Sequence, residues 1–266
     1  MKIQNKYALI TGATEGIGYE LAKLFAKDGY NLVIVARNQI ELDAAADELT
    51  QYGIQVITSA RDLFITEDVF GLCDELEQSK IEINILVNNA GQGVYGLFKD
   101  TALNRELDIV HLNINAVIIL TKHFLRKMLL RNEGKILNLA SIASKTPGPW
   151  QSVYHGTKAF ILSFSEALRS ELEDTNINVT ALLPGPTDTD FFNKADMNDS
   201  KAIQDKDSLA DPADVASDGY NALMNNKDKV ISGFTNKIKV SMTNILSDSL
   251  NAEMMKEQQK PVSGKS

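Results

Sequence analysis

The chain has 266 residues, which suffices for one large α/β domain or two small ones. Hydrophobic residues make up 44% and charged residues 23% of it, a balance that excludes an intrinsically disordered chain. The formal net charge of -8 argues against nucleic acid as the main partner, because binding a phosphate backbone requires a basic surface.

Cysteine content and apolar runs indicate the cellular setting. Cys73 is the single cysteine, so no internal disulfide is possible, and a buried structural thiol in a reducing compartment is the expected state. Residues 1–6 lack the apolar core of a signal peptide, and no apolar run approaches the ~18 residues of a membrane span. We therefore expect a cytoplasmic protein that does not contact a membrane.

Short apolar runs typical of strands alternate with amphipathic helical stretches up to about residue 233. The predicted strands cover residues 7–11, 31–36, 54–59, 83–88, 134–140, 177–183 and 229–232. The predicted helices cover residues 16–27, 39–51, 66–79, 102–131 and 152–174. A further helix begins at Asp211, a good N-cap, with Pro212 in its first turn.

This alternation determines the expected fold class. Short links between strands and helices predict right-handed crossovers and a parallel sheet with helices on both faces. The nearly unbroken apolar run at 31–36 suits a parallel strand covered on both sides. We predict an α/β fold with a doubly wound parallel sheet (Rossmann fold) of about seven strands, in a single domain over residues 1–250.

Two stretches depart from the alternation of strands and helices. Residues 184–209 are polar and irregular, with Phe191 and Phe192 embedded in them, and form either a substrate lid or a long surface connection. Residues 251–266 are rich in Lys, Gln and Glu, so we expect a polar, flexible C-terminal tail there.

The segment from Thr11 to Gly18, which reads TGATEGIG, joins the first predicted strand to the first predicted helix. Glycines let the backbone approach a pyrophosphate, and a helix N-terminus offers unpaired N–H groups to it. The spacing G-x-x-x-G-x-G differs from the general dinucleotide fingerprint, and a tight turn that needs positive φ is the other reading.

The end of the second predicted strand bears on the choice of cofactor. Ala36 stands where an acidic residue would bind the ribose 2′-hydroxyl of NAD, and Arg37 and Asn38 follow it. A guanidinium suits the 2′-phosphate of NADP, although a solvated surface arginine is the other reading. Glu15 in the glycine loop is a contrary sign. We predict that NADP(H) is preferred over NAD(H).

Tyr154 and Lys158 lie four residues apart in a predicted helix, so their side chains share one face. A nearby ammonium stabilises a phenolate and moves its pKa from about 10 towards neutral pH, where proton transfer is efficient. The pair alone is also common in ordinary amphipathic helices.

Several motifs occur together in chain order. They are Thr11-Gly12 with Gly16 and Gly18, Asn88-Asn89-Ala90-Gly91, Ser141, Tyr154 with Lys158, and Pro184-Gly185. Over about residues 6–233 this set resembles the short-chain dehydrogenase/reductase family, in its single-domain branch with TGxxxGxG and YxxxK motifs. The resemblance implies an NADP(H)-dependent oxidoreductase (EC 1.1.1.-) that transfers a hydride between nicotinamide and a small carbonyl or alcohol substrate. The alternatives are an NADPH-binding redox sensor without turnover and an epimerase or dehydratase on the same scaffold.

The resemblance also implies roles for the catalytic residues. Tyr154 would exchange the proton with the substrate oxygen, and Ser141 would polarise that oxygen. Lys158 would hold the nicotinamide ribose and lower the pKa of the tyrosine. Asn113 would anchor a water in the proton relay, with Asn115 as a nearby alternative.

Further residues match the cofactor site of that family. The cofactor-binding residues implied are Gly12, Thr14, Gly16, Ile17, Gly18, Arg37, Asn38, Asp62, Leu63, Asn89, Ala90, Gly91, Tyr154, Lys158, Pro184, Gly185, Thr187 and Thr189. Among them Asp62 would contact the adenine or else cap a helix, and Thr189 would meet the carboxamide. Residues 92–95 and 145–151, with the two phenylalanines, are the candidates for the substrate pocket.

No metal site is expected, because the three histidines are scattered and the acidic pairs lack metal-ligand spacing. Members of the family often pair through the two long helices, so a homodimer or homotetramer is expected. Ile109, Leu112, Ala116 and Leu120 form an apolar stripe on the first of these helices, which faces either a partner or its own sheet.

Overall fold

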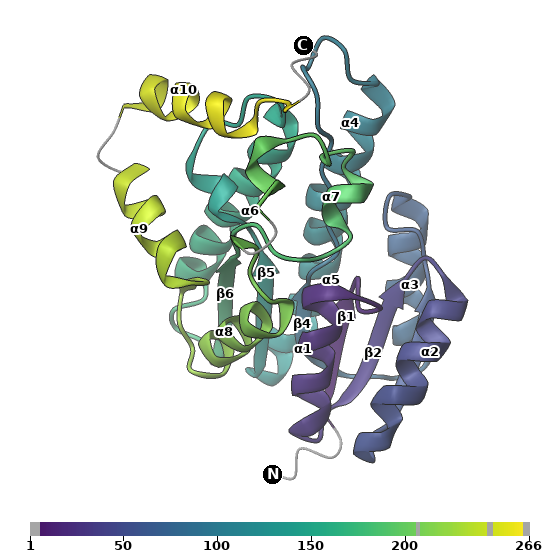
Figure 1. The fold of residues 1–266 in the computed structure, drawn as a ribbon. Coiled ribbons are helices and arrows are strands. Elements are labelled where there is room, and N and C mark those ends of the chain that lie inside the picture. The colour runs from purple at the N-terminus through teal and green to yellow at the C-terminus, as the bar shows by residue number, and fades with distance from the viewer. Residues whose placement is uncertain (1–5, 206–207, 244–246, 263–266) are drawn as a thin grey trace.

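The computed structural model describes residues 6–205, 208–243 and 247–262, and these form an α/β fold around a seven-stranded sheet. All neighbouring strands are parallel, and their order is β3-β2-β1-β4-β5-β6-β7. The strands are β1 (Tyr7–Thr11), β2 (Asn31–Ala36), β3 (Val56–Ala60), β4 (Ile83–Asn88), β5 (Gly134–Leu139), β6 (Ile177–Leu183) and β7 (Lys229–Ile231). The predicted doubly wound sheet in a single domain is confirmed (Figure 1).

Helices cover both faces of the sheet. They are α1 (Gly16–Lys27), α2 (Gln39–Leu49), α3 (Thr66–Gln78), α4 (Leu103–Val110), α5 (Ala116–Arg131), α6 (Ser152–Glu171), α7 (Phe191–Lys194), α8 (Pro212–Met224), α9 (Phe234–Thr243) and α10 (Asp248–Gln259). Helices α1, α2 and α8 share one buried apolar cluster with the sheet, and α3, α5 and α6 share another on the opposite face. The strands are apolar throughout because both of their faces are covered.

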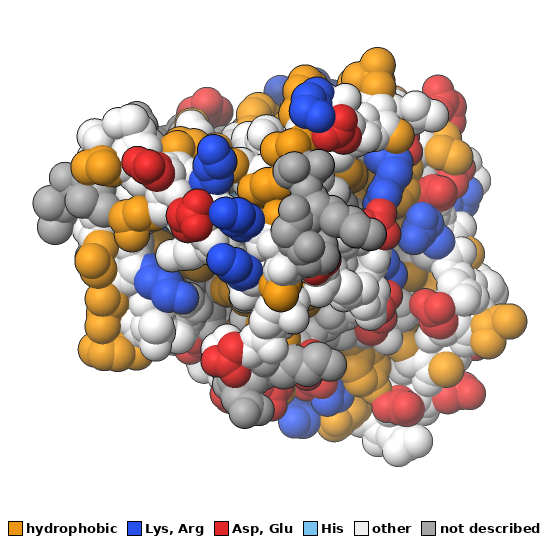
Figure 2. Space-filling model, turned by 45° about the horizontal axis from the view of Figure 1, so that its top comes forward, with side chains coloured by type: hydrophobic (Ala, Val, Ile, Leu, Met, Phe, Trp, Pro, Cys, Tyr) orange, Lys and Arg blue, Asp and Glu red, His pale blue; other side chains and the backbone are white. Residues whose placement is uncertain are grey.

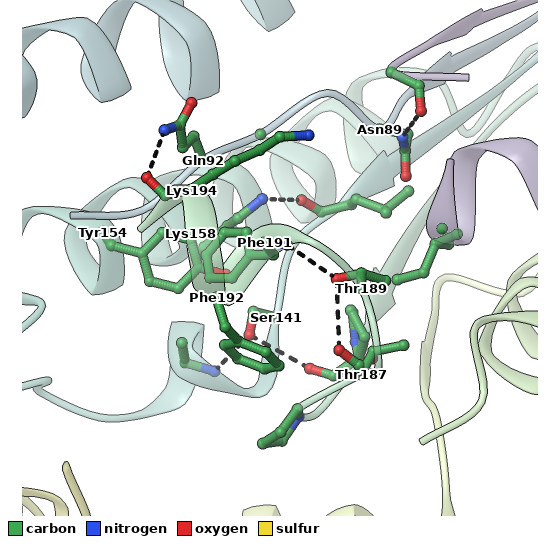
Figure 3. A pocket seen from close by; sticks show the side chains of 18 of the residues that line it. Asn89, Gln92, Ser141, Tyr154, Lys158, Thr187, Thr189, Phe191, Phe192 and Lys194 are labelled. Atoms are coloured by element: carbon green, nitrogen blue, oxygen red, sulfur yellow. Dashed lines mark hydrogen bonds between the residues drawn. The ribbon is translucent and has the colours of Figure 1, made fainter. Parts of the chain in front are cut away.

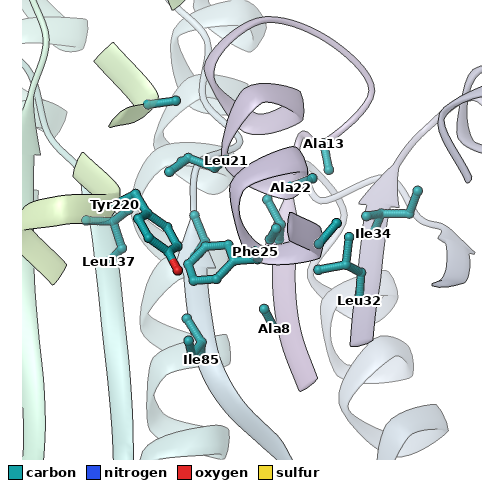
Figure 4. Packing of buried hydrophobic residues seen from close by; sticks show 14 of the residues in the cluster. Ala8, Ala13, Leu21, Ala22, Phe25, Leu32, Ile34, Ile85, Leu137 and Tyr220 are labelled. Carbon is teal, nitrogen blue, oxygen red and sulfur yellow. The ribbon is translucent and has the colours of Figure 1, made fainter. Parts of the chain in front are cut away.

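The packing of α1 shows how the first face is held. Phe25 is fully buried, and its ring lies edge-on to the ring of Tyr220 of α8 at 4.9 Å between centroids (Figure 4). Leu32 and Ile34 of β2 belong to the same cluster. Successive strand residues point to opposite faces, so Val33 between them packs in the other cluster. This packing places the N-terminus of α1 at the carboxyl edge of the sheet.

The helix predicted over 102–131 is interrupted. It consists of α4, a π-helical turn over His111–Asn115, and α5. The apolar pattern runs through the interruption without a break, so the extra residue in the turn cannot be predicted from it. π turns of this kind often lie at functional sites. The stripe Ile109, Leu112, Ala116 and Leu120 is buried in the protein's own core, which is the second of the two predicted readings.

The predicted lid at 184–209 carries a short helix, α7, and a 3-10 turn over Lys201–Ile203. Ala195, Met197 and Ile203 form a small buried cluster there, against which Phe191 and Phe192 pack. Residues 206 and 207 of the predicted lid lie outside the described part of the chain.

The structure differs from the predicted tail at 251–266. The expected boundary at residue 250 falls inside α10, which lies across the same side of the molecule as α7 (Figure 1). Its end is docked by main-chain hydrogen bonds, from Lys201 N to Lys260 O at 3.1 Å and from Val262 N to Asp199 O at 2.8 Å. Polar contacts hold this segment, and such contacts cannot be predicted from the spacing of apolar residues in the sequence. Residues 263–266 of the predicted tail lie outside the described residues.

Helix α9 exposes several apolar side chains. Phe234, Ile238 and Met242 are 78%, 47% and 53% exposed, at helical spacing. Figure 2 shows hydrophobic side chains gathered along the left edge of that view, where α9 lies. No helix within the described ranges is long and apolar enough to cross a bilayer.

Candidate active site

The carboxyl ends of the strands open into a cavity of about 1370 Å³. It lies where the strand order reverses between β1 and β4, the usual place for a ligand in such a sheet. A pocket for one small ligand measures about 300–1,000 Å³, so this cavity has room for a cofactor and a substrate together. All the predicted cofactor residues and Ser141 line it.

The glycine turn after β1 forms one wall. Gly12 and Gly16 have φ of +65° and +55°, which other residues rarely adopt. A Cβ on Gly18 would lie 2.1 Å from the carbonyl oxygen of Gly12, so the backbones touch here and no side chain fits. Asn89 pins the turn by donating to the carbonyl oxygens of Thr11 and Gly12 at 2.8 and 2.9 Å (Figure 3).

This cradle fits the pyrophosphate of a dinucleotide. Its glycines leave the backbone bare, and the N-terminus of α1 supplies N–H groups with a partial positive charge. Ile17, Ala90 and Gly91 line the cavity beside it. When bound, a nicotinamide cofactor would supply the hydride chemistry.

The end of β2 forms the wall at the adenosine side. Arg37 is exposed, and its guanidinium lies 5.3 Å from the ring centroid of Phe64. Asn38 caps α2 by accepting from Ile40 N at 3.0 Å and donates to Glu41 at 2.8 Å. Glu41 also lines the cavity, but it was not among the residues predicted from the sequence. Its carboxylate is held by the side chain of Asn38, the N-cap of α2, and a sequence pattern does not reveal this contact.

Asp62 is not a helix cap, since Ile65 occupies the N-cap position of α3. Its carboxylate accepts from Phe64 N at 3.1 Å, and its own N–H donates to Asp68 at 2.9 Å. Asp62 and Leu63 both line the cavity, so both can be reached by a ligand bound there.

Glu15, which counted against NADP in the sequence, is paired. Lys194 of α7 forms an ion pair with it and lies 3.3 Å from the carboxylate of Asp190. The pair joins the predicted lid to the glycine turn. Thr189 approaches the same turn, because a Cβ on Gly16 would lie 2.8 Å from its methyl group. Pro184, Gly185 and Thr187 complete this wall.

The catalytic candidates meet on the other side of the cavity. Tyr154 lies in the first turn of α6, and the ammonium of Lys158 lies 5.8 Å from the centroid of its ring. Lys158 donates to Leu139 O at 2.7 Å, at the end of β5. Ser141 follows two residues later, and its hydroxyl accepts from Ala143 N at 3.1 Å (Figure 3).

Burial governs the protonation of this group. It raises the pKa of Tyr154 to about 12, and hydrogen bonding with Ser141 lowers that pKa in part. Burial lowers the pKa of Lys158 to about 8. Burial, and not the ammonium of Lys158, therefore has the largest effect on the tyrosine pKa, since desolvation acts against both charged forms.

Asn113 lies in the π turn and is 1% exposed. Its side chain accepts from Gln92 N at 3.0 Å and donates to Gln92 O and Thr157 at 2.9 and 3.0 Å. Asn115 instead contacts His111 on its own helix at 2.9 Å. A Cβ on Gly91 would lie 3.3 Å from both the Asn113 amide oxygen and the Lys158 ammonium. Asn113 is therefore the one of the two that faces the lysine.

The substrate half of the cavity has walls that the sequence did not indicate. The residues of these walls are Met242, Met254, Met255 and Gln259 of α9 and α10. The ring of Phe191 lies 5.3 Å from that of Tyr154. Among the predicted pocket residues, those that line the cavity are Gln92, Thr146, Gln151, Phe191 and Phe192. No cluster of three or more metal-binding side chains is present in the described part of the chain.

Known proteins share this architecture. The model of the short chain dehydrogenase family matches residues 6–200. The oxidoreductase YvrD of Bacillus subtilis is 34% identical over 190 residues, which cover 71% of this chain and 72% of that protein. The very-long-chain 3-oxoacyl-CoA reductase of Laccaria bicolor is 36% identical over 179 residues, which cover 66% of this chain and 53% of the reductase. The chain thus spans about half the length of that relative.

A solved short-chain dehydrogenase from Sphingobium yanoikuyae in complex with NADPH superposes with a TM-score of 0.80 and 27% identity, over 91% of this chain and 95% of the other. The chain belongs to the short-chain dehydrogenase/reductase family, and it is an oxidoreductase of the class that acts on CH–OH and keto groups.

Proposed function

We propose that the protein is an NADP(H)-dependent reductase of a small carbonyl compound, with Tyr154 as the acid/base. The observation that carries this proposal is the grouping of Ser141, Tyr154 and Lys158 on one wall of the cavity whose opposite wall is the glycine cradle. An NADPH complex of a solved relative supports the choice of cofactor.

The residues divide the reaction among them. The substrate oxygen lies between the hydroxyls of Ser141 and Tyr154, which hydrogen-bond and polarise it. As a hydride adds to the carbonyl carbon, Tyr154 gives its proton to the oxygen and an alcohol results. A phenol whose pKa is about 12 is fully protonated at neutral pH, which suits an acid in the reductive direction.

Lys158 supports the tyrosine after the transfer. Because its pKa is about 8, it holds a proton at neutral pH and exchanges it readily. Its ammonium stabilises the phenolate that forms, and Asn113 holds the neighbouring backbone at Gln92 in place. Ser141 thus acts on the substrate oxygen, Lys158 acts on the charge of the phenolate, and Asn113 holds the wall of the site at Gln92.

A spectrophotometric assay with a panel of ketones, aldehydes and β-keto esters tests the function, with NADPH and NADH compared. We expect NADPH oxidation, and we expect Tyr154→Phe to lower kcat by about 10²–10⁴-fold while the Kd for NADPH stays the same. Tight NADPH binding with no oxidation across the panel would favour a redox sensor instead. A preference for NADH would overturn the proposed role of Arg37.

We also propose a homo-oligomer. Leu107 of α4, Ile118 of α5 and Phe160 of α6 are exposed by 50%, 39% and 37%. Phe160 stacks on Phe164 at 5.8 Å, which makes a flat apolar surface on α6. Exposed apolar faces of this kind commonly mark association surfaces.

A cytoplasmic location is proposed as well. Cys73 is buried, and burial raises the pKa of its thiol to about 12, so it is an unreactive structural thiol suited to a reducing compartment. Fractionation of the source cells would test this.

A further inference from the structure

Helix α10 turns one row of side chains toward the cavity. Asn251, Met255 and Gln259 follow one another at intervals of four residues, so they share one face of the helix, and all three line the cavity. Asn251 and Gln259 are 3% and 4% exposed, whereas Leu250 on another face of the helix is 50% exposed. The row of Asn251, Met255 and Gln259 is therefore the inner face of α10.

Hydrogen bonds hold both ends of this inner face. The side-chain nitrogen of Asn251 donates to Thr243 O, at the end of α9, at 2.9 Å. The side-chain nitrogen of Gln259 lies 3.1 Å from His155 Nε2. His155 lines the cavity too, and the centroid of its ring lies 6.1 Å from that of Tyr154. The inner face thus forms a wall, about 12 Å long along the helix axis, that runs from the neighbourhood of Tyr154 to the end of α9.

Met255 lies midway along this wall and is partly buried. Its thioether is at most a weak hydrogen-bond acceptor, so the middle of the wall offers a ligand apolar contact. Lys201, Lys239 and Glu257 also line the cavity, but all three are exposed. Their charged groups can remain in water, so they do not make the middle of the wall polar.

Further apolar side chains of the cavity come from the lid and from α9. The ring of Phe191 lies 5.3 Å from that of Tyr154, and Met197 N donates to Phe192 O at 2.9 Å. Methionine is unbranched and adapts its shape, so surfaces rich in it accept apolar ligands of varied shape. The chain has seven methionines, and those that line the cavity in its described part are Met197, Met242, Met254 and Met255.

We propose that the inner face of α10 binds an elongated apolar group of the substrate, and that Met255 sets the preference for the length of that group. The inference rests on the proposed function, because Tyr154 is taken to meet the reacting carbonyl. A carbonyl held at Tyr154 lies at one end of a wall about 12 Å long, most of which a compact ketone would leave uncovered. The substrate class is therefore a ketone whose carbonyl carries a chain of several carbons, which is removed from water on binding.

The test uses methyl ketones whose second alkyl group lengthens from ethyl to heptyl, with NADPH as the reductant. Because the burial of each methylene strengthens binding by up to about fourfold, we expect kcat/KM to rise about twofold to fourfold per added methylene. The readout is the ratio of kcat/KM for the heptyl ketone to that for the ethyl ketone. A ratio near one in the parent would overturn the apolar wall and leave the proposed function standing.

Met255→Gln keeps the length of the side chain but adds a polar amide, and it should lower the heptyl-to-ethyl ratio at least about tenfold. Met255→Leu keeps an apolar side chain of similar volume and should retain most of the ratio. Leu250→Gln makes the same kind of change on the exposed side of α10, at a residue that does not line the cavity, and should leave the ratio unchanged. Equal ratios in the parent and in Met255→Gln would overturn the role of Met255.

If no ketone of the series is reduced at all, the proposed function fails, and binding alone decides the apolar wall. Equilibrium dialysis of the ethyl and heptyl ketones against Tyr154→Phe, with NADPH present, then measures the two Kd values without turnover. We expect the Kd for the heptyl ketone to be at least about tenfold lower than that for the ethyl ketone, and we expect Met255→Gln in this background to remove most of the difference. Equal Kd values for the two ketones in Tyr154→Phe would overturn the proposal.

Discussion

Lys158, which the proposed function places beside the acid/base, is a buried amine. Burial lowers its pKa from 10.5 to about 8, so the charged form is disfavoured in the folded state. Between pH values of about 8 and 10.5 the unfolded chain therefore binds more protons than the folded chain. The contribution of Lys158 to the free energy of unfolding rises with pH across this range. At neutral pH the folded protein carries the penalty in full.

Replacing Lys158 by Met tests this balance through urea denaturation. We expect the unfolding free energy of the parent, relative to Lys158→Met, to increase by roughly 3 kcal/mol as the pH rises from about 8 to above 10. The parent also donates a hydrogen bond to Leu139 O, which both the ammonium and the neutral amine can form. Lys27→Met, at an exposed position of α1, is the control. A difference that does not vary with pH would mean that Lys158 is not desolvated.

Arg37 and Glu41 have opposite charges at the adenosine end of the cavity. Arg37→Leu should raise the KM for NADPH about 10–100-fold and leave that for NADH nearly unchanged, because one charge-assisted contact to the 2′-phosphate is lost. Glu41→Gln should lower the KM for NADPH by removing repulsion. Steady-state kinetics with both cofactors measure the two effects, with the exposed Arg126→Leu as control. If the KM values for NADPH and NADH rise by the same factor, Arg37 does not bind the 2′-phosphate.

At the level of elements, α7 is tied to the glycine turn by the pair of Lys194 and Glu15. An exposed ion pair contributes about 0.2–1 kcal/mol, so Lys194→Met should raise the dissociation rate of NADPH by up to about fivefold. Stopped-flow displacement in Lys194→Met, Glu15→Gln and the double variant measures the coupling between the two residues. Additive effects would mean that the pair does not hold the lid, and the effect should shrink at high salt.

Most elements were predictable because their signals are local. Apolar runs such as 31–36 and the glycine turn depend on residues adjacent in the chain, and the structure has both where expected. The site depends on longer-range geometry. Gln259 reaches His155 across 104 positions, and the π turn that directs Asn113 inward leaves the apolar pattern of its helix unchanged. No pattern within a short window registers such contacts.

Exposed apolar side chains on α4, α5 and α6 (Leu107, Ile118 and Phe160) make up the proposed association face. If this face joins two copies, Ile118→Glu with Phe160→Glu should convert the oligomer to a monomer of about 29 kDa in sedimentation experiments, because two charges would be buried unpaired. Phe234→Glu on the exposed face of α9 is the matched control and should not change the assembly. A monomeric parent across micromolar concentrations would remove the proposal.

A single short segment serves both halves of the cavity. Thr189 lies against Gly16 at the glycine turn, and two residues later Phe191 lies against Tyr154 on the opposite wall. A ligand that moves one of these residues therefore moves the other, so the two ligands do not enter and leave independently. If the proposed nucleotide and ketone occupy these two walls, the expected kinetic counterpart of such a shared segment is coupled binding, in which each ligand changes the rate at which the other binds and leaves.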